Sequence, residues 1–216
     1  MKDITAIIFD LDGVICSTDE YHYRAWKQLA DQWNIPFGRT VNNRLRGVSR
    51  MESLEIVLEK YHGPALSRKQ KEELADYKNT IYRESLKAMS PADLSGEVKS
   101  TLDILRKRGY ALGIGSSSKN TPFILKQIGL ADFFDAVVDG NQIAHSKPDP
   151  EVFLKAAEKL HRDPAQCLVV EDAVSGAEAG HAGGFRVACV GDAAQAGAGD
   201  ENLKCFSELK ELPYLQ

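Results

Sequence analysis

The chain has 216 residues, of which 43% are hydrophobic and 27% charged, an ordinary balance for a globular protein of one large domain or two unequal ones. Lys and Arg number 27 against 31 Asp and Glu, which gives a net charge of −4. No basic block stands apart from acidic residues, and this argues against nucleic acid or an anionic membrane surface as a partner. No apolar run approaches the roughly 18 residues of a membrane span, and the sequence shows no signal-peptide pattern. The four cysteines show no paired metal-ligand spacing. We therefore expect a cytoplasmic protein.

A short apolar run near the N-terminus leads into two acidic residues. Ala6, Ile7 and Ile8 are followed by the sequence FDLDGV, which contains Asp10 and Asp12. A continuous apolar run predicts a strand that is buried on both faces, and residues two apart on a strand can project to the same side. Two carboxylates at such a strand end suit a site for a divalent cation and a phosphoryl group. The alternative is a plain hairpin turn at Asp12-Gly13.

Residues 19–89 contain no convincing strand and predict an all-helical block. Their apolar residues recur every three or four positions, as on one face of a helix. The three stripes consist of Tyr21, Ala25, Leu29 and Trp33; of Leu54, Val57, Leu58 and Tyr61; and of Leu74, Tyr77 and Ile81.

From about residue 97 the pattern alternates between helix and strand. Repeated βα units predict a Rossmann-like, doubly wound parallel sheet with helices on both faces. This α/β core would comprise residues 1–18 and 90–216, with residues 19–89 inserted as a helical domain. The predicted strands are 110–115, 136–138, 167–170 and 186–190, a small-residue helix spans 174–182, and residues 193–199 read as a loose surface loop.

Polar residues follow four of the predicted strands, and ligands of open parallel sheets bind beyond these carboxyl ends. Asp10 and Asp12 follow the first strand, Lys147 lies in the sequence SKPDP, and the acid pair Glu171-Asp172 ends the strand at 167–170. The second strand leads into the sequence SSSKN, comprising Ser116, Ser117, Ser118, Lys119 and Asn120. Hydroxyl and amide groups before a helix can bind a phosphate, and paired acids can bind a hard cation. Each segment alone also has a structural explanation as a helix cap, a turn or a solvated strand end.

The order of these four segments resembles the haloacid dehalogenase superfamily of phosphotransferases, with the helical block as its α-helical cap. The resemblance covers essentially the whole chain and narrows to the β-phosphoglucomutase branch. The segments that carry it are FDLDGV at Phe9, DEYHYRAW at Asp19, RGVSRMESL at Arg46, YKN at Tyr77, MSPADL at Met89, SSSKN at Ser116, SKPDP at Ser146 and EDAVSG at Glu171.

The resemblance implies a role for each matching core residue. Asp10 would be the nucleophile and Asp12 the general acid/base. Mg²⁺ would be held by Asp10, the backbone carbonyl of Asp12 and Asp172, with Glu171 close by. Ser116 and Lys147 would bind the reacting phosphate. Arg50 would bind the non-reacting phosphate together with Ser118, Lys119 and Asn120. Some relatives have a small apolar residue at the position of Ser117, where a backbone N–H could bind phosphate equally well.

The remaining implied substrate-binding positions lie in the cap. They are Thr18, His22, Trp26, Gly47, Val48, Ser49, Ser53 and Lys78. From the residues alone, His22 and Trp26 share a helix face and could simply pack, and Lys78 on a charged helix would be solvated.

The resemblance implies a Mg²⁺-dependent enzyme that interconverts β-glucose 1-phosphate and glucose 6-phosphate through an aspartyl-phosphate and a 1,6-bisphosphate. A sugar-phosphate phosphatase on the same scaffold is one rival, and a non-catalytic sugar-phosphate sensor is another. The expected partner is a small sugar phosphate, with no nucleic acid and no membrane, and the expected state is a monomer.

Overall fold

A computed structural model describes residues 3–45 and 48–216 and divides the chain into two compact units. The first unit comprises residues 1–17 and 90–216, and the second comprises residues 18–89. The predicted helical block began one residue later, at Asp19.

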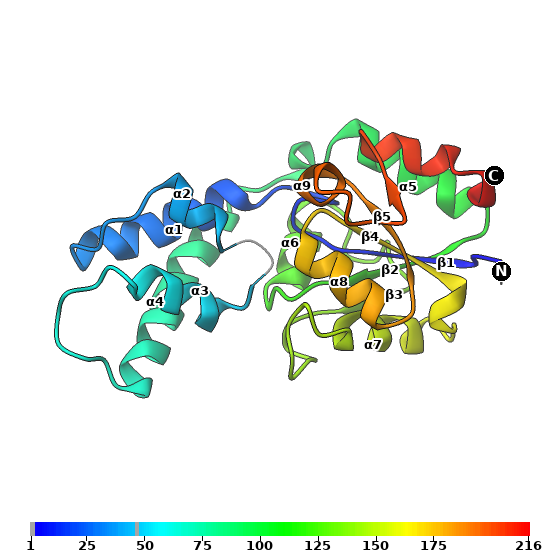
Figure 1. The fold of residues 1–216 in the computed structure, drawn as a ribbon. Helices are drawn as coiled ribbons and strands as arrows, with labels where there is room; N and C mark the ends of the chain where they lie inside the picture. Colours follow the sequence, from blue (N-terminus) through cyan, green and yellow to red (C-terminus); the bar gives the residue numbers. More distant parts are fainter. Residues whose placement is uncertain (1–2, 46–47) are drawn as a thin grey trace. The chain divides into compact units, whose positions relative to one another are not determined.

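The first unit is built on a six-stranded sheet, shown with its helices in Figure 1. The strands lie in the order β3-β2-β1-β4-β5-β6, and every neighbouring pair is parallel. Their bounds are β1 Ala6–Phe9, β2 Ala111–Gly115, β3 Ala136–Val138, β4 Cys167–Glu171, β5 Arg186–Cys189 and β6 Glu201–Asn202. This doubly wound arrangement confirms the predicted α/β fold class.

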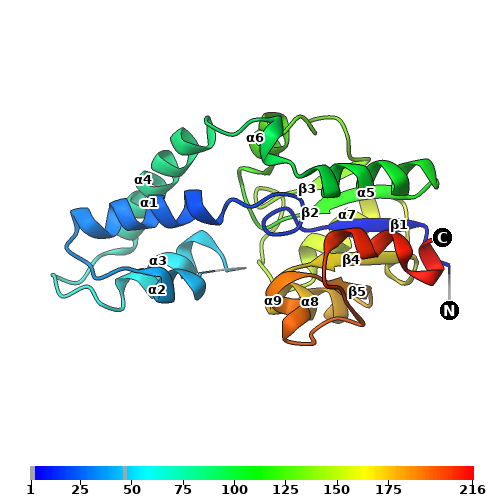
Figure 2. The same ribbon diagram turned by 90° about the horizontal axis from the view of Figure 1, so that it is seen from above.

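Helices cover both faces of this sheet. They are α5 Gly96–Lys107, α6 Thr121–Gln127, α7 Glu151–Lys159, α8 Val174–Ala182 and α9 Gly191–Gln195, with short 3₁₀ helices η1 Pro91–Asp93, η2 Pro164–Gln166, η3 Phe206–Glu211 and η4 Pro213–Leu215. Helices α7 and α8 lie on one face of the sheet, where Ile8 and Phe153 belong to one buried cluster (Figures 1 and 2). Helices α5 and η3 lie on the other face, where Phe9 contacts Phe206. Burying both strand faces explains the unbroken apolar runs.

The second unit is all-helical, as its apolar periodicity predicts. It consists of α1 Asp19–Gln32, α2 Arg39–Asn43, α3 Arg50–Leu58 and α4 Arg68–Leu86. Helices α1 and α3 pack against α4 around a core that includes Trp26, Leu29, Leu54 and Leu74. No described helix in either unit is long and apolar enough to cross a membrane.

Two predictions of local structure were wrong. Residues 193–199 are not simply a loose loop, because α9 extends to Gln195 and the side chain of Ala193 is fully buried. The buried face of α4 was also misjudged: Tyr77 is 41% exposed, whereas Lys78 and Tyr82 are buried. Apolar periodicity overlooked this face because one of its members is a lysine.

Candidate active site

The carboxyl ends of three neighbouring strands bring the predicted core residues together. Phe9 of β1 is in register with Ile114 of β2 and with Val170 of β4. Asp10, Ser116 and Glu171 therefore emerge at the same edge of the sheet. The strand order reverses between β1 and β4, and this is where ligands bind in doubly wound folds. The hairpin interpretation of Asp12-Gly13 is wrong, since both described neighbours of β1 are parallel to it.

A buried lysine joins two of the acids. Lys147 Nζ donates a hydrogen bond to Asp10 Oδ1 at 2.5 Å and a second to Glu171 Oε1. The three residues are 4%, 7% and 1% exposed, so their charges are almost entirely removed from solvent. The same ammonium group lies 4.7 Å from the centre of the Phe153 ring. Charges buried this deeply are tolerated only when they are paired.

Crowding among the acids perturbs their protonation. Burial raises the pKa of Asp10 to about 7, and the charges of Glu171 and Asp12 add to this rise while Lys147 opposes it. Burial likewise raises the pKa of Asp172 to about 8, with further contributions from Asp10 and Glu171. Burial by itself would lower the pKa of Lys147, but Asp10 and Glu171 outweigh it and hold that pKa above its ordinary value. In this site burial and the neighbouring acids therefore disfavour the ionised forms of Asp10 and Asp172.

Two glycines allow the backbone to approach these carboxylates closely. Gly13 has a φ of +87°, and a Cβ there would lie 2.0 Å from Asp172 Oδ2. A Cβ on Gly176 would lie 2.0 Å from the carboxylate of Glu171. The second oxygen of Glu171 also accepts hydrogen bonds of 2.9 Å from the backbone N–H groups of Asp172 and Ala173. The orientation of both acids is therefore tightly fixed.

The segment after β2 forms a compact turn that leads into α6. The Ser116 hydroxyl oxygen accepts a hydrogen bond from the Ser118 N–H at 3.2 Å, and the Ser118 hydroxyl oxygen accepts one from the Asn120 N–H at 3.3 Å. Ser116 and Asn120 are buried, whereas Lys119 is exposed. The predicted phosphate-binding residues from 116 to 120 thus form one short loop at the same edge of the sheet as Asp10.

In the helical unit, a second cluster gathers around Lys78. The Lys78 Nζ lies 2.8 Å from His22 Nδ1 and 4.7 Å from the ring centres of both Trp26 and Tyr82. His22 stacks on Tyr82 at 4.0 Å, and the Tyr82 hydroxyl donates to Thr18 Oγ1 at 3.0 Å. Burial and the charges of Lys78 and Arg50 hold the pKa of His22 well below its ordinary value, so the neutral ring accepts from Lys78. Lys78 is 3% exposed, so the alternative interpretation of a solvated lysine was wrong.

The other predicted residues of this unit lie at the start of α3. Ser49 caps the helix through reciprocal hydrogen bonds with Glu52, and Arg50 Nη1 lies 3.4 Å from Asp76 Oδ1. Burial lowers the pKa of the Arg50 guanidinium, although Asp76 opposes this change. The remaining predicted positions differ in accessibility: Ser53 is buried, Val48 is partly buried, and Gly47 lies outside the described residues.

Three residues that sequence reasoning did not select contact the selected ones or lie beside them. Tyr82 and Asp76 contact His22 and Arg50, and the spacing of Tyr82 one helical turn after Lys78 was a usable signal. Asp139 is buried directly after β3, where it accepts a 2.8 Å hydrogen bond from the Asn141 N–H. The sequence Val-Val-Asp-Gly placed this acid directly at the end of the predicted strand 136–138.

The predicted metal ligands suit a hard cation in their chemistry. Carboxylate and carbonyl oxygens are the donors that Mg²⁺ prefers. A divalent cation bound here would favour the ionised forms of Asp10 and Asp172, which burial disfavours. Within residues 3–45 and 48–216, no three His, Cys, Asp or Glu side chains group as a metal site. Glu171 is already engaged by Lys147 and two backbone amides. The set of metal ligands that fits is therefore Asp10, Asp172 and the backbone carbonyl of Asp12, while Glu171 pairs with Lys147.

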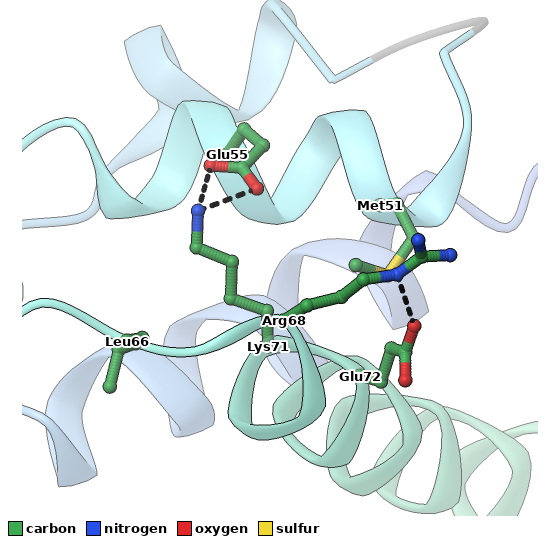
Figure 3. A pocket seen from close by; sticks show the side chains of 6 residues that line it. All are labelled: Met51, Glu55, Leu66, Arg68, Lys71 and Glu72. Carbon is green, nitrogen blue, oxygen red and sulfur yellow. Dashed lines mark hydrogen bonds and ion pairs between the residues drawn. The ribbon is translucent and has the colours of Figure 1, made fainter.

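A pocket of about 400 Å³ lies elsewhere in the helical unit, between α3 and the start of α4 (Figure 3). Its lining residues are Met51, Glu55, Leu66, Arg68, Lys71 and Glu72. Lys71 binds both oxygens of Glu55 at 2.7 and 2.8 Å, and Arg68 Nε binds Glu72 at 2.9 Å. None of the predicted site residues that the structure describes lines this pocket.

Comparison with known proteins identifies the family to which the chain belongs. The family model described as haloacid dehalogenase-like hydrolase matches residues 4–184, and the chain belongs to this family. Within it, the chain is 42% identical to the β-phosphoglucomutase of Bacillus subtilis over 189 residues, which are 86% of this chain and 83% of that protein. The crystal structure of β-phosphoglucomutase from Clostridium difficile matches with a TM-score of 0.89 and 33% identity, over 96% of this chain and 93% of that one. The resemblance drawn from the motifs is thereby confirmed.

The relatives also include phosphatases. The chain is 30% identical to the fructose-1-phosphate phosphatase of Escherichia coli, over 83% of this chain and 92% of that protein. Family membership thus supports chemistry on phosphate esters, and both transfer and hydrolysis occur among similar chains.

Proposed function

We propose that this protein is a Mg²⁺-dependent mutase that interconverts β-glucose 1-phosphate and glucose 6-phosphate. The observation that carries the proposal is the buried Asp10, held by Lys147 at the sheet edge next to the serine loop of residues 116–120. A carboxylate fixed beside a cation and several hydrogen-bond donors is suited to attack a phosphorus atom. The 42% identity to a β-phosphoglucomutase favours the mutase over other phosphate-ester reactions.

In the proposed reaction, Asp10 carries the phosphoryl group between two sugar oxygens. A phospho-Asp10 enzyme donates its phosphoryl group to the 6-hydroxyl of β-glucose 1-phosphate while Asp12 takes up the hydroxyl proton. The product of this step is the 1,6-bisphosphate. After the bisphosphate reorients, Asp10 attacks the phosphorus at C1, the bond to O1 breaks, and Asp12 returns its proton to O1. Glucose 6-phosphate leaves and phospho-Asp10 is restored.

The proposed metal ligands are Asp10, Asp172 and the backbone carbonyl of Asp12. Mg²⁺ bound there would neutralise negative charge on the transferring group. Lys147 and Ser116 would hold the reacting phosphate, and Glu171 would keep Lys147 in place through their ion pair.

A mutase must bind a phosphate at either end of its intermediate, so it needs a second phosphate site. In the core, Ser118, Lys119 and Asn120 are candidates for such phosphate contacts, and in the helical unit the candidate is Arg50. The cluster of His22, Trp26 and Lys78 offers polar and aromatic groups that suit a sugar.

A sugar-phosphate phosphatase is the second candidate, and the similarity to the fructose-1-phosphate phosphatase is what favours it. It would use the same core residues and let water attack phospho-Asp10. A sugar-phosphate sensor has less support, because binding alone needs no buried carboxylate beside a second acid. The monomeric state and the cytoplasmic location stay predictions.

One product assay separates the candidates. The purified protein is primed with acetyl phosphate and given Mg²⁺ and β-glucose 1-phosphate, and glucose 6-phosphate and free phosphate are measured together. We expect glucose 6-phosphate to exceed free phosphate, and the Asp10→Asn variant to form neither. Free phosphate without glucose 6-phosphate would favour the phosphatase, and no turnover would favour the sensor.

A further inference from the structure

The turn that follows β3 lies against the serine loop that follows β2. The Ser116 N–H donates a hydrogen bond of 3.0 Å to the carbonyl oxygen of Val138, the last residue of β3. The Gly140 N–H donates one of 3.2 Å to the carbonyl oxygen of Ser118. Residues 139–141, which we call the β3 turn, are therefore bonded to the serine loop through the backbone.

Gly140 brings these two segments into close contact. A Cβ at this position would lie 2.3 Å from the carbonyl oxygen of Ser117 and 3.0 Å from Lys119 Cγ. The carbonyl oxygen is a backbone atom, so it can give way only if the loop moves with it. The position of the serine loop is thus tied to that of the β3 turn.

The side chain of Asn141 adds a further bond between the two segments. Its Nδ2 donates a hydrogen bond of 3.1 Å to the carbonyl oxygen of Lys119. Its own backbone N–H donates to the buried carboxylate of Asp139 at 2.8 Å, which fixes the residue within the turn. Asn141 is exposed, so its visible contribution to the structure comes from these hydrogen bonds and not from burial.

We propose that Asn141 is a positioning residue that acts through Lys119. By holding the Lys119 carbonyl, it fixes the backbone from which the Lys119 ammonium reaches the non-reacting phosphate of the substrate. Asn141 itself touches neither the phosphate nor the sugar. This inference rests on the proposed function, in which Lys119 is a candidate contact of that phosphate, and it names a residue that determines substrate affinity from outside the predicted site.

The kinetic consequence follows from which phosphate is bound. The non-reacting phosphate keeps its charge throughout the transfer, so a contact with it stabilises the bound substrate and the transition state about equally. Loss of such a contact raises KM and leaves kcat nearly unchanged. A residue that served only the stability of the fold would show no such division between the two constants.

The test compares the Asn141→Ala variant with wild type on two substrates. For β-glucose 1-phosphate we expect KM to rise roughly threefold to tenfold, as for one lost hydrogen bond, with kcat little changed. The rate at which acetyl phosphate phosphorylates Asp10 should stay the same, because acetyl phosphate has no second phosphate. In a Lys119→Ala background, Asn141→Ala should raise KM far less, since the ammonium that it positions is then absent.

The matched control is Asn202→Ala. Asn202 is also exposed, and its Nδ2 likewise donates to a backbone carbonyl, that of Gly199 at 2.9 Å, in the loop next to β6. This variant should leave KM at the wild-type value. Both variants should unfold at nearly the wild-type temperature, because each loses one hydrogen bond at the surface.

Two results would overturn the inference. A KM less than about threefold above wild type in Asn141→Ala would show that the bond to Lys119 does not affect substrate binding. A rise of the same size with and without the Lys119 side chain would show that Asn141 does not act through it. Glucose 6-phosphate formed at an unchanged KM would refute this role of Asn141 and leave the proposed mutase standing, since the product assay on the wild-type protein decides the mutase separately.

Discussion

Removing the buried cation Lys147 should destabilise the core in a way that depends on pH. In Lys147→Met, the carboxyls of Asp10 and Glu171 lose the ammonium that pairs with both. Breaking a buried ion pair by deleting one partner costs about 3 to 5 kcal/mol. We therefore expect the free energy of unfolding, measured by urea denaturation without Mg²⁺, to fall by about that amount at pH 7. The control Lys99→Met breaks the solvent-exposed pair with Asp103 and should cost about 0.5 kcal/mol or less.

The dependence on pH follows from Asp10. Its pKa in the folded protein, about 7, lies above the ordinary value of 3.8, so the folded state binds more protons than the unfolded state between these values. Stability from this group is present at low pH and is lost as the pH rises through the folded pKa. Without Lys147 that pKa rises further, and the loss continues to a higher pH than in wild type.

The stability difference between wild type and Lys147→Met should therefore grow above about pH 7, by up to about 1.4 kcal/mol per pH unit for one carboxyl. The double variant Lys147→Met/Glu171→Gln leaves fewer uncompensated charges and should recover part of the loss. A single variant within about 1 kcal/mol of wild type, or a difference that does not change with pH, would refute this account of the buried cluster.

Four further changes probe individual residues. Asp12→Asn should lower turnover by roughly 10² to 10⁴ yet keep the Mg²⁺ dependence, because the proposed metal contact is a backbone carbonyl; near-normal turnover would remove Asp12 as the acid/base. Gly13→Ala should raise the Mg²⁺ concentration needed for half-maximal activity, because the added Cβ would displace the carboxylate of Asp172. An unchanged Mg²⁺ requirement would be evidence that Asp172 is not a metal ligand. His22 is neutral in the folded protein, so its protonation in the unfolded chain should cost about 1 kcal/mol of stability between about pH 7 and 5.5. Urea unfolding should therefore show a difference in the free energy of unfolding between wild type and His22→Phe that changes with pH. A difference that stays constant would contradict this prediction. Arg50→Ala should lose most mutase flux while acetyl phosphate still phosphorylates Asp10, and intact formation of glucose 6-phosphate would favour the phosphatase.

The core was largely predictable because its strands are buried on both faces. Such strands read as unbroken apolar runs, and their polar ends identify the edge of the sheet that holds Asp10, Lys147 and Glu171. The small-residue helix was predicted at 174–182, the range that α8 spans. Local pattern and tertiary packing agree in this part of the chain.

Features that depend on contacts between distant segments were not predictable. The burial of Lys78 arises because α1 brings His22 and Trp26 against α4, and nothing within the charged helix itself signals this. The hydrogen bond from Lys147 to Glu171 likewise joins residues 24 positions apart, and the sequence alone did not pair these two residues.

The central claim is that Asp10 carries the phosphoryl group, and direct chemical mapping tests it. The protein is incubated with acetyl phosphate and Mg²⁺, quenched in acid, and digested, and the phosphorylated peptide is identified with and without hydroxylamine. We predict one acid-stable, hydroxylamine-sensitive phosphate on Asp10, which is absent from Asp10→Asn. A phosphate on any other residue, or glucose 6-phosphate formed by Asp10→Asn, would contradict the account.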